Sequence, residues 1–373
     1  MPPVQYHLNK FPPLSIDWSK LIPSIGKARG ALGSYNGLLS AIPEASLLLS
    51  PLTTNEARLS SQIEGTHVTL TEVLEIEAGG ELDDFSPERR NDAEEVLNYR
   101  YALQMSAAEM KEKGLSQHLM RQTHARLMQG VRGMDKSPGS YRTEQNWIGS
   151  PGCSIETASF IPIAPEHLSS GMDLWNEYLN RADVLDPIVQ LATAHVEFEA
   201  LHPFKDGNGR LGRMLIPLFL FKKGILSGPN FYMSGYFEEN KDIYLDKLRR
   251  VSSHDEWTEW CHFFLESVAL QAGENEKRAR NILQLNDTTR VRAAESTKSP
   301  HCVKVVDFIF HSPIFRIPRL SQKTGIPEPT ARRLVSVLTD SNILDILRPC
   351  SGRRSAVYYF PELINAAEGR KVF

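Results

Sequence analysis

The twelve residues from His202 to Arg213 hold the side chains of this chain that are best suited to catalysis. His202 can take up a proton near neutral pH, as a general base must. Asp206 offers hard carboxylate oxygens of the kind that Mg²⁺ prefers. A base beside a metal ligand and a cationic clamp is the set of groups that phosphoryl or nucleotidyl transfer requires.

The same stretch also predicts a site for an anion. Gly207, Asn208 and Gly209 can adopt positive φ angles, so that successive backbone N–H groups can point at one spot. An apolar stripe at helical spacing follows, formed by Leu211, Met214, Leu215, Leu218 and Phe219. Phosphate oxygens would therefore meet a helix N-terminus, with Arg210 and Arg213 three residues apart on one face. The alternative is a simple turn that caps a core helix, with solvated arginines.

The motif His-Pro-Phe-x-Asp-Gly-Asn-Gly-Arg-x-x-Arg, complete at 202–213, resembles the signature of the Fic domain. The resemblance implies transfer of AMP from ATP to a Ser, Thr or Tyr hydroxyl of a protein, with Mg²⁺. It implies that His202 is the general base and that Asp206 holds the metal. The remaining ATP-binding residues would be Lys205, Gly207, Asn208, Gly209, Arg210 and Arg213. Transfer of another phospho-group from a different donor stays open.

A second motif precedes this core. Thr53 and Glu56 fit a capping box that starts a helix, and Gly65 is typical of the position just past a helix end. Glu64 then lies at the negative end of the helix dipole, which is locally unfavourable and suggests a cationic partner elsewhere. The alternative is a solvated surface carboxylate.

Ser60 to Gly65 resembles the Fic inhibitory motif, Ser/Thr-x-x-x-Glu-Gly/Asn. The resemblance implies that Glu64 pairs with Arg213, so that ATP binds in a pose unsuited to attack. The chain would then be autoinhibited, and removal of AMP assisted by Glu64 is a further reaction that the family allows.

Two segments are candidates for contacts with substrates. The short β-prone runs within 145–162 predict a hairpin, which in the Fic family is a flap that docks the target protein by main-chain pairing. A hairpin that only links helices is the alternative. Tyr236, Asn240 and Tyr244 are spaced to share one helical face, and the resemblance places them at the adenine. The alternative is an amphipathic surface helix.

Residues 298–355 hold 10 Lys or Arg against 4 Asp or Glu, in a chain of net charge −3. Helices at 303–310, 319–324 and 329–340, then strands at 346–350 and 357–360, look like a winged helix-turn-helix. Arg332, Arg333, Arg353 and Arg354 could contact DNA if they face one way. The same module could instead bind a protein or form a homodimer. A DNA-binding regulator with a nucleotide-sensing Fic core is therefore the competing function.

The chain therefore reads as a mainly α protein: a Fic helical core with a small β-hairpin flap, plus a C-terminal winged helix-turn-helix. We assign 1–89 to an N-terminal arm and inhibitory helix, 90–270 to the core, 271–297 to a helical linker and 298–373 to the winged helix. Residues 1 to about 45 are expected to be largely extended, because they carry several prolines. His118 and His124 are expected to be structural or exposed. His195 is expected to be a satisfied core histidine, with a metal site shared with His202 as the alternative.

Composition is consistent with a cytoplasmic enzyme. No run of 18 or more apolar residues predicts a membrane span, and Met1 to Tyr6 lack the features of a secretory signal. The four cysteines are scattered without a CxxC pair, which favours reduced thiols over a zinc site.

Overall fold

The computed structural model describes residues 2–42, 45–79, 85–131, 134–352 and 354–373. The fold is mainly α-helical, as predicted, and its sheets are small. The chain divides into two compact units. The first contains Met1–Asn36, Leu59–Gly65 and Asn98–Gly273, and the second contains Gly37–Arg58, Thr66–Leu97 and Glu274–Phe373.

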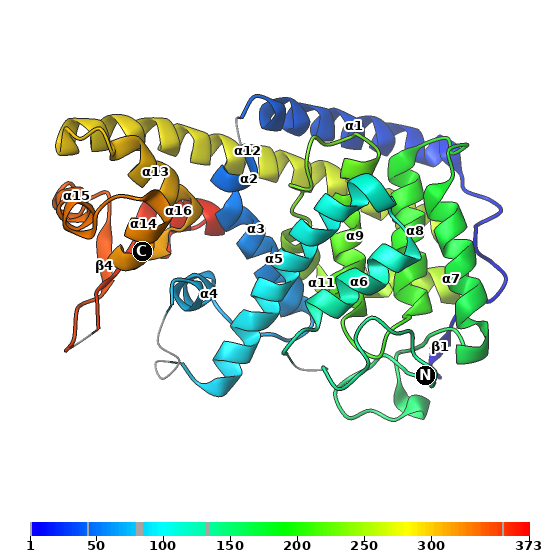
Figure 1. Ribbon diagram of the computed structural model, residues 1–373. Helices are drawn as coiled ribbons and strands as arrows, with labels where there is room; N and C mark the ends of the chain where they lie inside the picture. Colours follow the sequence, from blue (N-terminus) through cyan, green and yellow to red (C-terminus); the bar gives the residue numbers. More distant parts are fainter. Residues whose placement is uncertain (1, 43–44, 80–84, 132–133, 353) are drawn as a thin grey trace. The chain divides into compact units, whose positions relative to one another are not determined.

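Four long helices contribute residues to both units: α1 (Trp18–Ser40), α3 (Ser50–Ile63), α5 (Pro87–Lys113) and α12 (Trp257–Thr297). The other helices of the first unit are α6 (Gln117–Leu127), α7 (Pro165–Asn180), α8 (Pro187–Leu201), α9 (Asn208–Lys222), α10 (Ser234–Glu239) and α11 (Lys241–His254). Helices α8 and α9 pack against each other (Figure 1).

Helix α8 forms the centre of the first unit and leads into the His202 motif. It begins as predicted, because Asp186 accepts hydrogen bonds from the N–H groups of Ile188 and Val189 and Pro187 takes the first helical position. Nearly all of its side chains are buried, as expected for a helix surrounded by others. The indoles of Trp175 and Trp260 donate hydrogen bonds to carbonyls of this helix, which holds it between α7 and α12.

The expectation of an extended N-terminal arm is wrong for residues 18–40, which form α1. The apolar residues Leu21, Ala28, Leu32, Tyr35 and Leu39 recur at helical spacing and are all buried. Burial of such a stripe stabilises a helix more than one proline and several glycines destabilise it. Pro23 lies inside α1 and does not interrupt it.

The capping box expected at Thr53 and Glu56 is also wrong. Helix α3 begins at Ser50, and the Thr53 hydroxyl donates to the Leu49 carbonyl inside the helix. A capping box occurs instead at Thr69 and Glu72, where α4 (Leu70–Glu77) starts. The predicted end of α3 is confirmed, since the helix stops at Ile63 and Gly65 has a φ of 94°.

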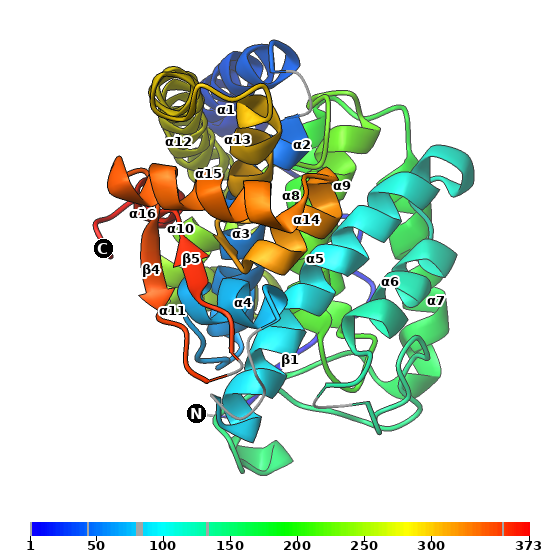
Figure 2. The ribbon, with the colours of Figure 1, turned by 60° about the vertical axis from the view of Figure 1, so that its left-hand side comes forward.

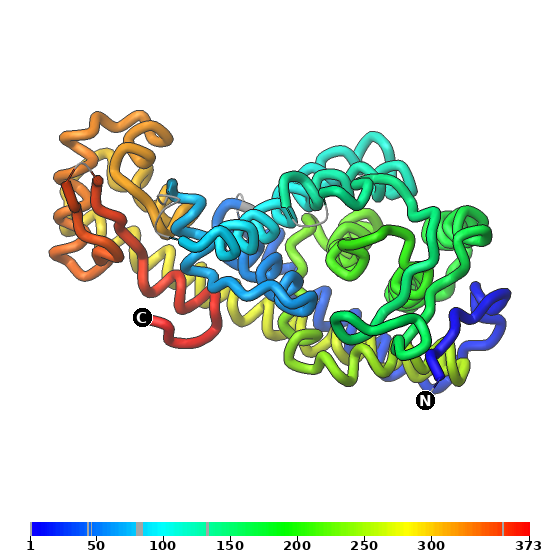
Figure 3. Tube along the Cα trace, turned by 90° about the horizontal axis from the view of Figure 1, so that it is seen from below, coloured from blue at the N-terminus to red at the C-terminus, as the bar shows by residue number. Residues whose placement is uncertain are grey.

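The predicted hairpin at 145–162 is reduced to one antiparallel bridge, between Ile148 and Phe160, with a 3₁₀ turn at Ile155–Thr157. Strand β2 (Phe160–Ile161) pairs in parallel with β1 (Val4–Gln5), so β1, in blue in Figure 3, lies beside this flap. We use "flap" below for residues 145–162. The prediction missed β1 because strand pairing between distant segments leaves no local pattern.

The helices wholly within the second unit are α2 (Ala45–Leu48), α4, α13 (Cys302–His311), α14 (Ile317–Thr324), α15 (Glu328–Asp340) and α16 (Pro361–Glu368). Strands β3 (Ile314–Phe315), β4 (Asp345–Arg348) and β5 (Val357–Tyr359) form an antiparallel sheet in the order β3-β5-β4. Figure 2 shows β4 beside β5. The predicted order of three helices and two strands is confirmed, whereas β3 and α16 were not predicted. Arg353 lies outside the described residues.

Candidate functional site

The motif loop is fixed by its own side chains. Helix α8 ends at Leu201, and His202 caps it in the left-handed conformation, with φ 46° and ψ 60°. The Asn208 amide accepts a hydrogen bond from the Phe204 N–H and donates one to the Phe204 carbonyl, each at 2.8 Å. Gly207, with φ 76°, precedes α9. Asn208 therefore shapes the loop with its side chain, which leaves its main chain for any ligand.

The geometry around His202 favours a neutral imidazole with a free acceptor nitrogen. Its Nδ1 lies 3.3 Å from the Glu199 carbonyl oxygen. Because a carbonyl can only accept, Nδ1 carries the hydrogen and Nε2 keeps its lone pair. Burial lowers the pKa of His202 to about 4, so the ring is uncharged at neutral pH. His202 can therefore accept a proton at Nε2.

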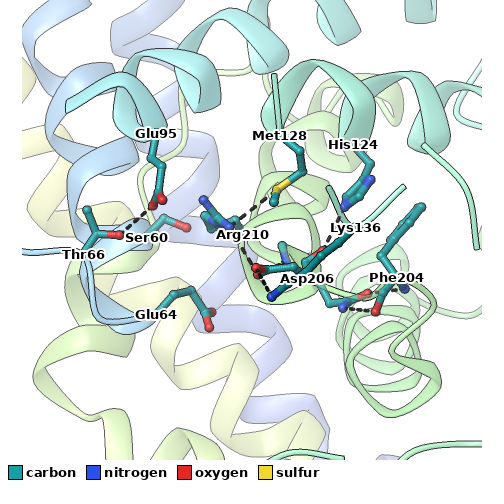
Figure 4. A network of polar contacts seen from close by, with 12 residues as sticks. Ser60, Glu64, Thr66, Glu95, His124, Met128, Lys136, Phe204, Asp206 and Arg210 are labelled. Atoms are coloured by element: carbon teal, nitrogen blue, oxygen red, sulfur yellow. Dashed lines mark hydrogen bonds and ion pairs between the residues drawn. The ribbon is translucent and has the colours of Figure 1, made fainter. Parts of the chain in front are cut away.

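Asp206 presents a half-exposed carboxylate at the beginning of α9. Its Oδ1 accepts from the Gly207 N–H at 2.6 Å, and its Oδ2 lies 3.3 Å from the Lys136 ammonium (Figure 4). The described residues contain no cluster of three or more metal-ligating side chains. Asp206 would thus hold Mg²⁺ together with substrate phosphates and water, which is how this ion commonly binds in such enzymes.

The Glu64 carboxylate lies directly against Gly209, in the backbone of the predicted anion site. A Cβ atom added at Gly209 would lie 2.2 Å from Glu64 Oε1 and 2.9 Å from Arg213 Nη1. Any larger residue would displace that carboxylate. The first turn of α9 therefore has an anionic group of the protein itself where a phosphate is predicted.

The pairing of Glu64 with Arg213, which the resemblance implied, is present. Glu64 Oε1 accepts from Arg213 Nη2 at 2.6 Å, and Arg213 also donates to the hydroxyl and carbonyl of Ser60. Arg213 is 2% exposed and the Glu64 side chain 41%. Although burial raises the pKa of Glu64, the nearby guanidinium outweighs it and the net pKa is lowered. Both groups are therefore charged at neutral pH.

Arg210 and Lys205 occupy different surroundings. Arg210 is buried, with Nη2 3.5 Å from Asp206 Oδ1 and 3.6 Å from Met128 Sδ (Figure 4). Lys205 is exposed, and its ammonium lies 3.5 Å from Glu144 Oε2. The structure thus brings His202, Asp206, Arg210, Arg213 and Glu64 around one loop, while Lys205 points to the surface.

The predicted common helical face of Tyr236, Asn240 and Tyr244 is wrong. The helix breaks at Asn240 between α10 and α11, where the Asn240 side chain donates to the Tyr236 carbonyl. Tyr244 is 1% exposed and stacks on Phe237 at 4.2 Å. Asn side chains compete for backbone groups, which explains the break. Tyr244 is therefore a core residue in this structure, and it does not share an exposed helical face with Tyr236 and Asn240.

The structural role predicted for His195 is confirmed, because the ring is buried and both of its nitrogens are hydrogen-bonded. Its Nδ1 donates to the Gly212 carbonyl at 3.0 Å, so its Nε2 accepts from the Tyr244 hydroxyl at 2.8 Å. Burial lowers the pKa of His195 to about 3, which keeps the ring neutral. This chain of hydrogen bonds joins α8, α9 and α11 beneath the site.

Two residues outside the motif support the loop: His124, whose structural role was expected but not its place at the loop, and Arg142, which was not singled out. His124 stacks on Phe204 at 3.8 Å between ring centres, and its Nε2 donates to the Asp206 carbonyl at 2.9 Å. Its Nδ1 accepts from the Gly139 N–H, which sets the tautomer. Arg142 donates to the His202 carbonyl at 2.9 Å. Both residues are far from the loop in sequence, so no spacing signal could have revealed them.

Comparison with known proteins finds two matching family models. Residues 22–108 match the Fic/DOC family N-terminal model, and residues 114–220 match the Fic/DOC family model. Protein adenylyltransferase fic-1 of Caenorhabditis briggsae is 34% identical over 88 residues, which are 23% of this chain and 16% of that protein. A probable protein adenylyltransferase of Aquifex aeolicus is 29% identical over 151 residues, which are 40% of this chain and 41% of that protein. The chain thus spans less than half of these curated relatives.

Solved structures share the fold. A Fic family protein from Desulfovibrio desulfuricans G20 superposes with a TM-score of 0.56 at 20% identity, covering 94% of this chain and 98% of that one. Fic-1 (aa134–508) from C. elegans gives a TM-score of 0.53 at 19% identity, covering 72% of this chain and 74% of that one.

Proposed function

The chain belongs to the Fic/DOC family, and from that premise we propose that it is a protein adenylyltransferase. The substrates would be ATP and a Ser, Thr or Tyr hydroxyl of a target protein. The observation that carries the proposal is the neutral His202, whose acceptor Nε2 belongs to the same loop as the predicted anion site. In the structure the Glu64 carboxylate lies against that predicted site at Gly209. Curated relatives that carry the name protein adenylyltransferase also support it.

The proposed transfer is a single in-line displacement. The target hydroxyl oxygen attacks the α-phosphorus of ATP, its proton goes to His202 Nε2, and the bond to pyrophosphate breaks. Arg210, Arg213 and the N–H groups at 207–209 would bind the β- and γ-phosphates. Asp206 would hold Mg²⁺, which supplies charge neutralisation at the phosphates when bound.

We also propose that Glu64 inhibits this transfer. The Glu64 carboxylate lies against Gly209 and takes the guanidinium of Arg213, so it occupies the place of a terminal phosphate. A carboxylate that must be displaced weakens productive ATP binding. Hydrolysis of the AMP–protein bond is a second reaction that the Glu64 carboxylate could assist. Loss of AMP from prelabelled protein can be compared with and without Glu64→Gly.

The test uses [α-³²P]ATP with Mg²⁺ and measures self-labelling together with labelling of lysate proteins. Glu64→Gly should raise the rate by about 10-fold or more, because Arg213 is released. The matched control is Glu239→Gly, which removes an exposed carboxylate from the end of α10 and should leave the rate unchanged. Adding His202→Ala to Glu64→Gly should lower the rate by about 100-fold to 10,000-fold. Undiminished labelling by that double variant would refute the base assignment.

We propose that the target protein docks on the flap. The Ile148 N–H donates to the Phe160 carbonyl, and the Ile148 carbonyl accepts from the N–H groups of Ser159 and Phe160. The other edge of β2 is paired with β1. Because strand residues alternate in direction, Trp147 and Gly149 would present their main-chain groups to an added strand. An extended segment carrying the hydroxyl would bind at that edge.

DNA binding by the second unit is the competing proposal. Arg332 and Arg333 are exposed on α15, which supports it. However, Arg319 pairs with Glu77 and Arg348 with Glu75, both on α4. Those two carboxylates lie outside 298–355 and offset part of its positive charge. A gel shift with a salt titration tests the proposal, because phosphate contacts make binding strongly salt-dependent.

A further inference from the structure

Arg142 is a buried cation whose hydrogen bonds go to backbone carbonyls. It is 3% exposed, and it has no carboxylate partner among the residues that the structure describes. Burial lowers its pKa to about 10, so it stays charged at neutral pH. A buried charge without a counter-ion is unfavourable unless its donors are satisfied by well-placed acceptors. Its acceptors therefore reveal its role.

The first set of acceptors is the end of the helix that carries the base. Arg142 Nη2 donates to the Leu201 carbonyl at 3.2 Å and Nε donates to the His202 carbonyl at 2.9 Å. Its backbone N–H donates to the Pro203 carbonyl at 2.9 Å. The last carbonyls of a helix lack partners within the helix, and a cation there is also favoured by the dipole. Arg142 thus caps α8 and stabilises the left-handed backbone of His202.

The second set of acceptors belongs to the two ends of the flap. Nη1 donates to the Glu144 carbonyl at 3.1 Å, and Nη2 donates to the Ile163 carbonyl at 2.5 Å. These carbonyls come directly before and after residues 145–162. One planar guanidinium therefore joins both ends of the flap to the backbone of the catalytic base.

We propose that Arg142 is a positioning residue that sets the distance between a hydroxyl presented on the flap and Nε2 of His202. The inference rests on the proposed transfer and deepens it. A misplacement of about 1 Å between reacting groups can lower a rate about 100-fold. Lysine would keep the positive charge, but its single ammonium lacks the planar set of N–H groups with which the guanidinium reaches carbonyls of α8 and of the flap at once. The anion site should be spared, because Asn208 and His124 hold it independently.

The test compares Arg142→Lys and Arg142→Gln in the Glu64→Gly background. Self-labelling rates are measured against ATP concentration, and MgATP affinity is measured by calorimetry with the Glu64→Gly, His202→Ala protein as host. We expect the maximal rate to fall about 100-fold, with KM and Kd for ATP within about 2-fold. The matched control is Arg121→Lys, which alters an exposed guanidinium that donates to the Gly139 carbonyl of the preceding loop but does not reach His202.

Amide hydrogen exchange gives a readout that is independent of activity. Arg142→Lys should speed exchange in both 145–162 and 201–204, whereas Arg121→Lys should change neither. A full maximal rate in Arg142→Lys, or a loss of ATP affinity parallel to the rate, would overturn the inference. If Glu64→Gly itself transfers no AMP, the proposed function fails separately. Amide hydrogen exchange in Arg142→Lys then still decides whether Arg142 couples residues 145–162 to residues 201–204.

Discussion

At the scale of the residue, the environment of His202 suits the role of general base that we propose for it. The Glu199 carbonyl orients the ring through Nδ1, and burial keeps it uncharged. The protonation state of this proposed base thus depends on its environment as well as on its residue type. Glu64 is controlled in the same way, because the adjacent Arg213 keeps its carboxylate ionised and engaged.

The lowered pKa of His202 leads to a prediction for the pH profile. A general base works in its deprotonated form, so the maximal rate of Glu64→Gly should stay level from neutral pH to about pH 5. It should fall only at pH values below about 4, because the pKa of His202 in the intact protein is about 4 and the Glu64 charge, which raises that pKa, is missing from this variant. An unperturbed histidine would instead lose the rate around pH 6.5. Initial rates in constant-ionic-strength buffers give the profile, and an acidic limb near 6.5 would contradict the buried state of the ring.

At the scale of the element, β1 ties the flap to α8. The strand pairs with β2, and the next two residues reach the buried Glu197 of α8. Tyr6 donates to Glu197 Oε1 at 2.6 Å, and His7 Nε2 lies 2.8 Å from Glu197 Oε2. The N-terminal segment is therefore part of the core that supports the site.

This contact predicts a large effect of His7→Ala on stability. The substitution leaves the carboxylate of Glu197 buried without its imidazole partner, which should lower the free energy of unfolding by about 3 kcal/mol or more. Urea unfolding followed by circular dichroism measures this. Lys10→Ala removes an exposed ion pair with Asp255 and should change the free energy by less than about 1 kcal/mol. Equal effects of the two variants would show that the buried pair does not anchor β1.

At the scale of the whole molecule, the distribution of charge bears on partners. The net charge of −3 conceals a positive segment at 298–355, and α4 neutralises part of it through Glu75 and Glu77. No described helix is long and apolar enough to cross a membrane. Among the described residues, exposed cations of this segment such as Arg333 and Arg332 are accessible to an anionic partner, although Arg332 also pairs with Glu328 at 2.8 Å.

If the second unit binds DNA, these arginines set the salt dependence. Replacing Arg332 and Arg333 by alanine should reduce the magnitude of the slope of log binding constant against log salt concentration by about 2. Each phosphate contact that is removed lowers that magnitude by about one. Arg319→Ala should leave the slope unchanged, because Glu77 engages that guanidinium where both side chains are mostly covered. The pair of Arg332 with Glu328 is exposed, so a phosphate can replace the carboxylate at little cost. Gel shifts at several salt concentrations give the slopes, and a slope that does not depend on Arg332 and Arg333 would argue for a protein partner instead.

The sequence by itself determined the parts whose causes are local. The Asp186-Pro187 cap, the turn at Gly65 and the loop and helix of 202–213 each depend on residues within one or two helical turns, so spacing was sufficient to predict them. The pairing of Glu64 with Arg213 came from resemblance to a family motif and is present in the structure.

Only the tertiary structure decided the contacts between distant segments. The helix at 18–40, the pairing of β1 with β2, the burial of Tyr244 and the supports from His124 and Arg142 depend on partners far along the chain. Such partners impose no periodicity on the local sequence. Their geometry follows from packing, which local propensity describes poorly. The residues that we propose to react could thus be selected from the sequence, whereas the groups that hold them in place could not.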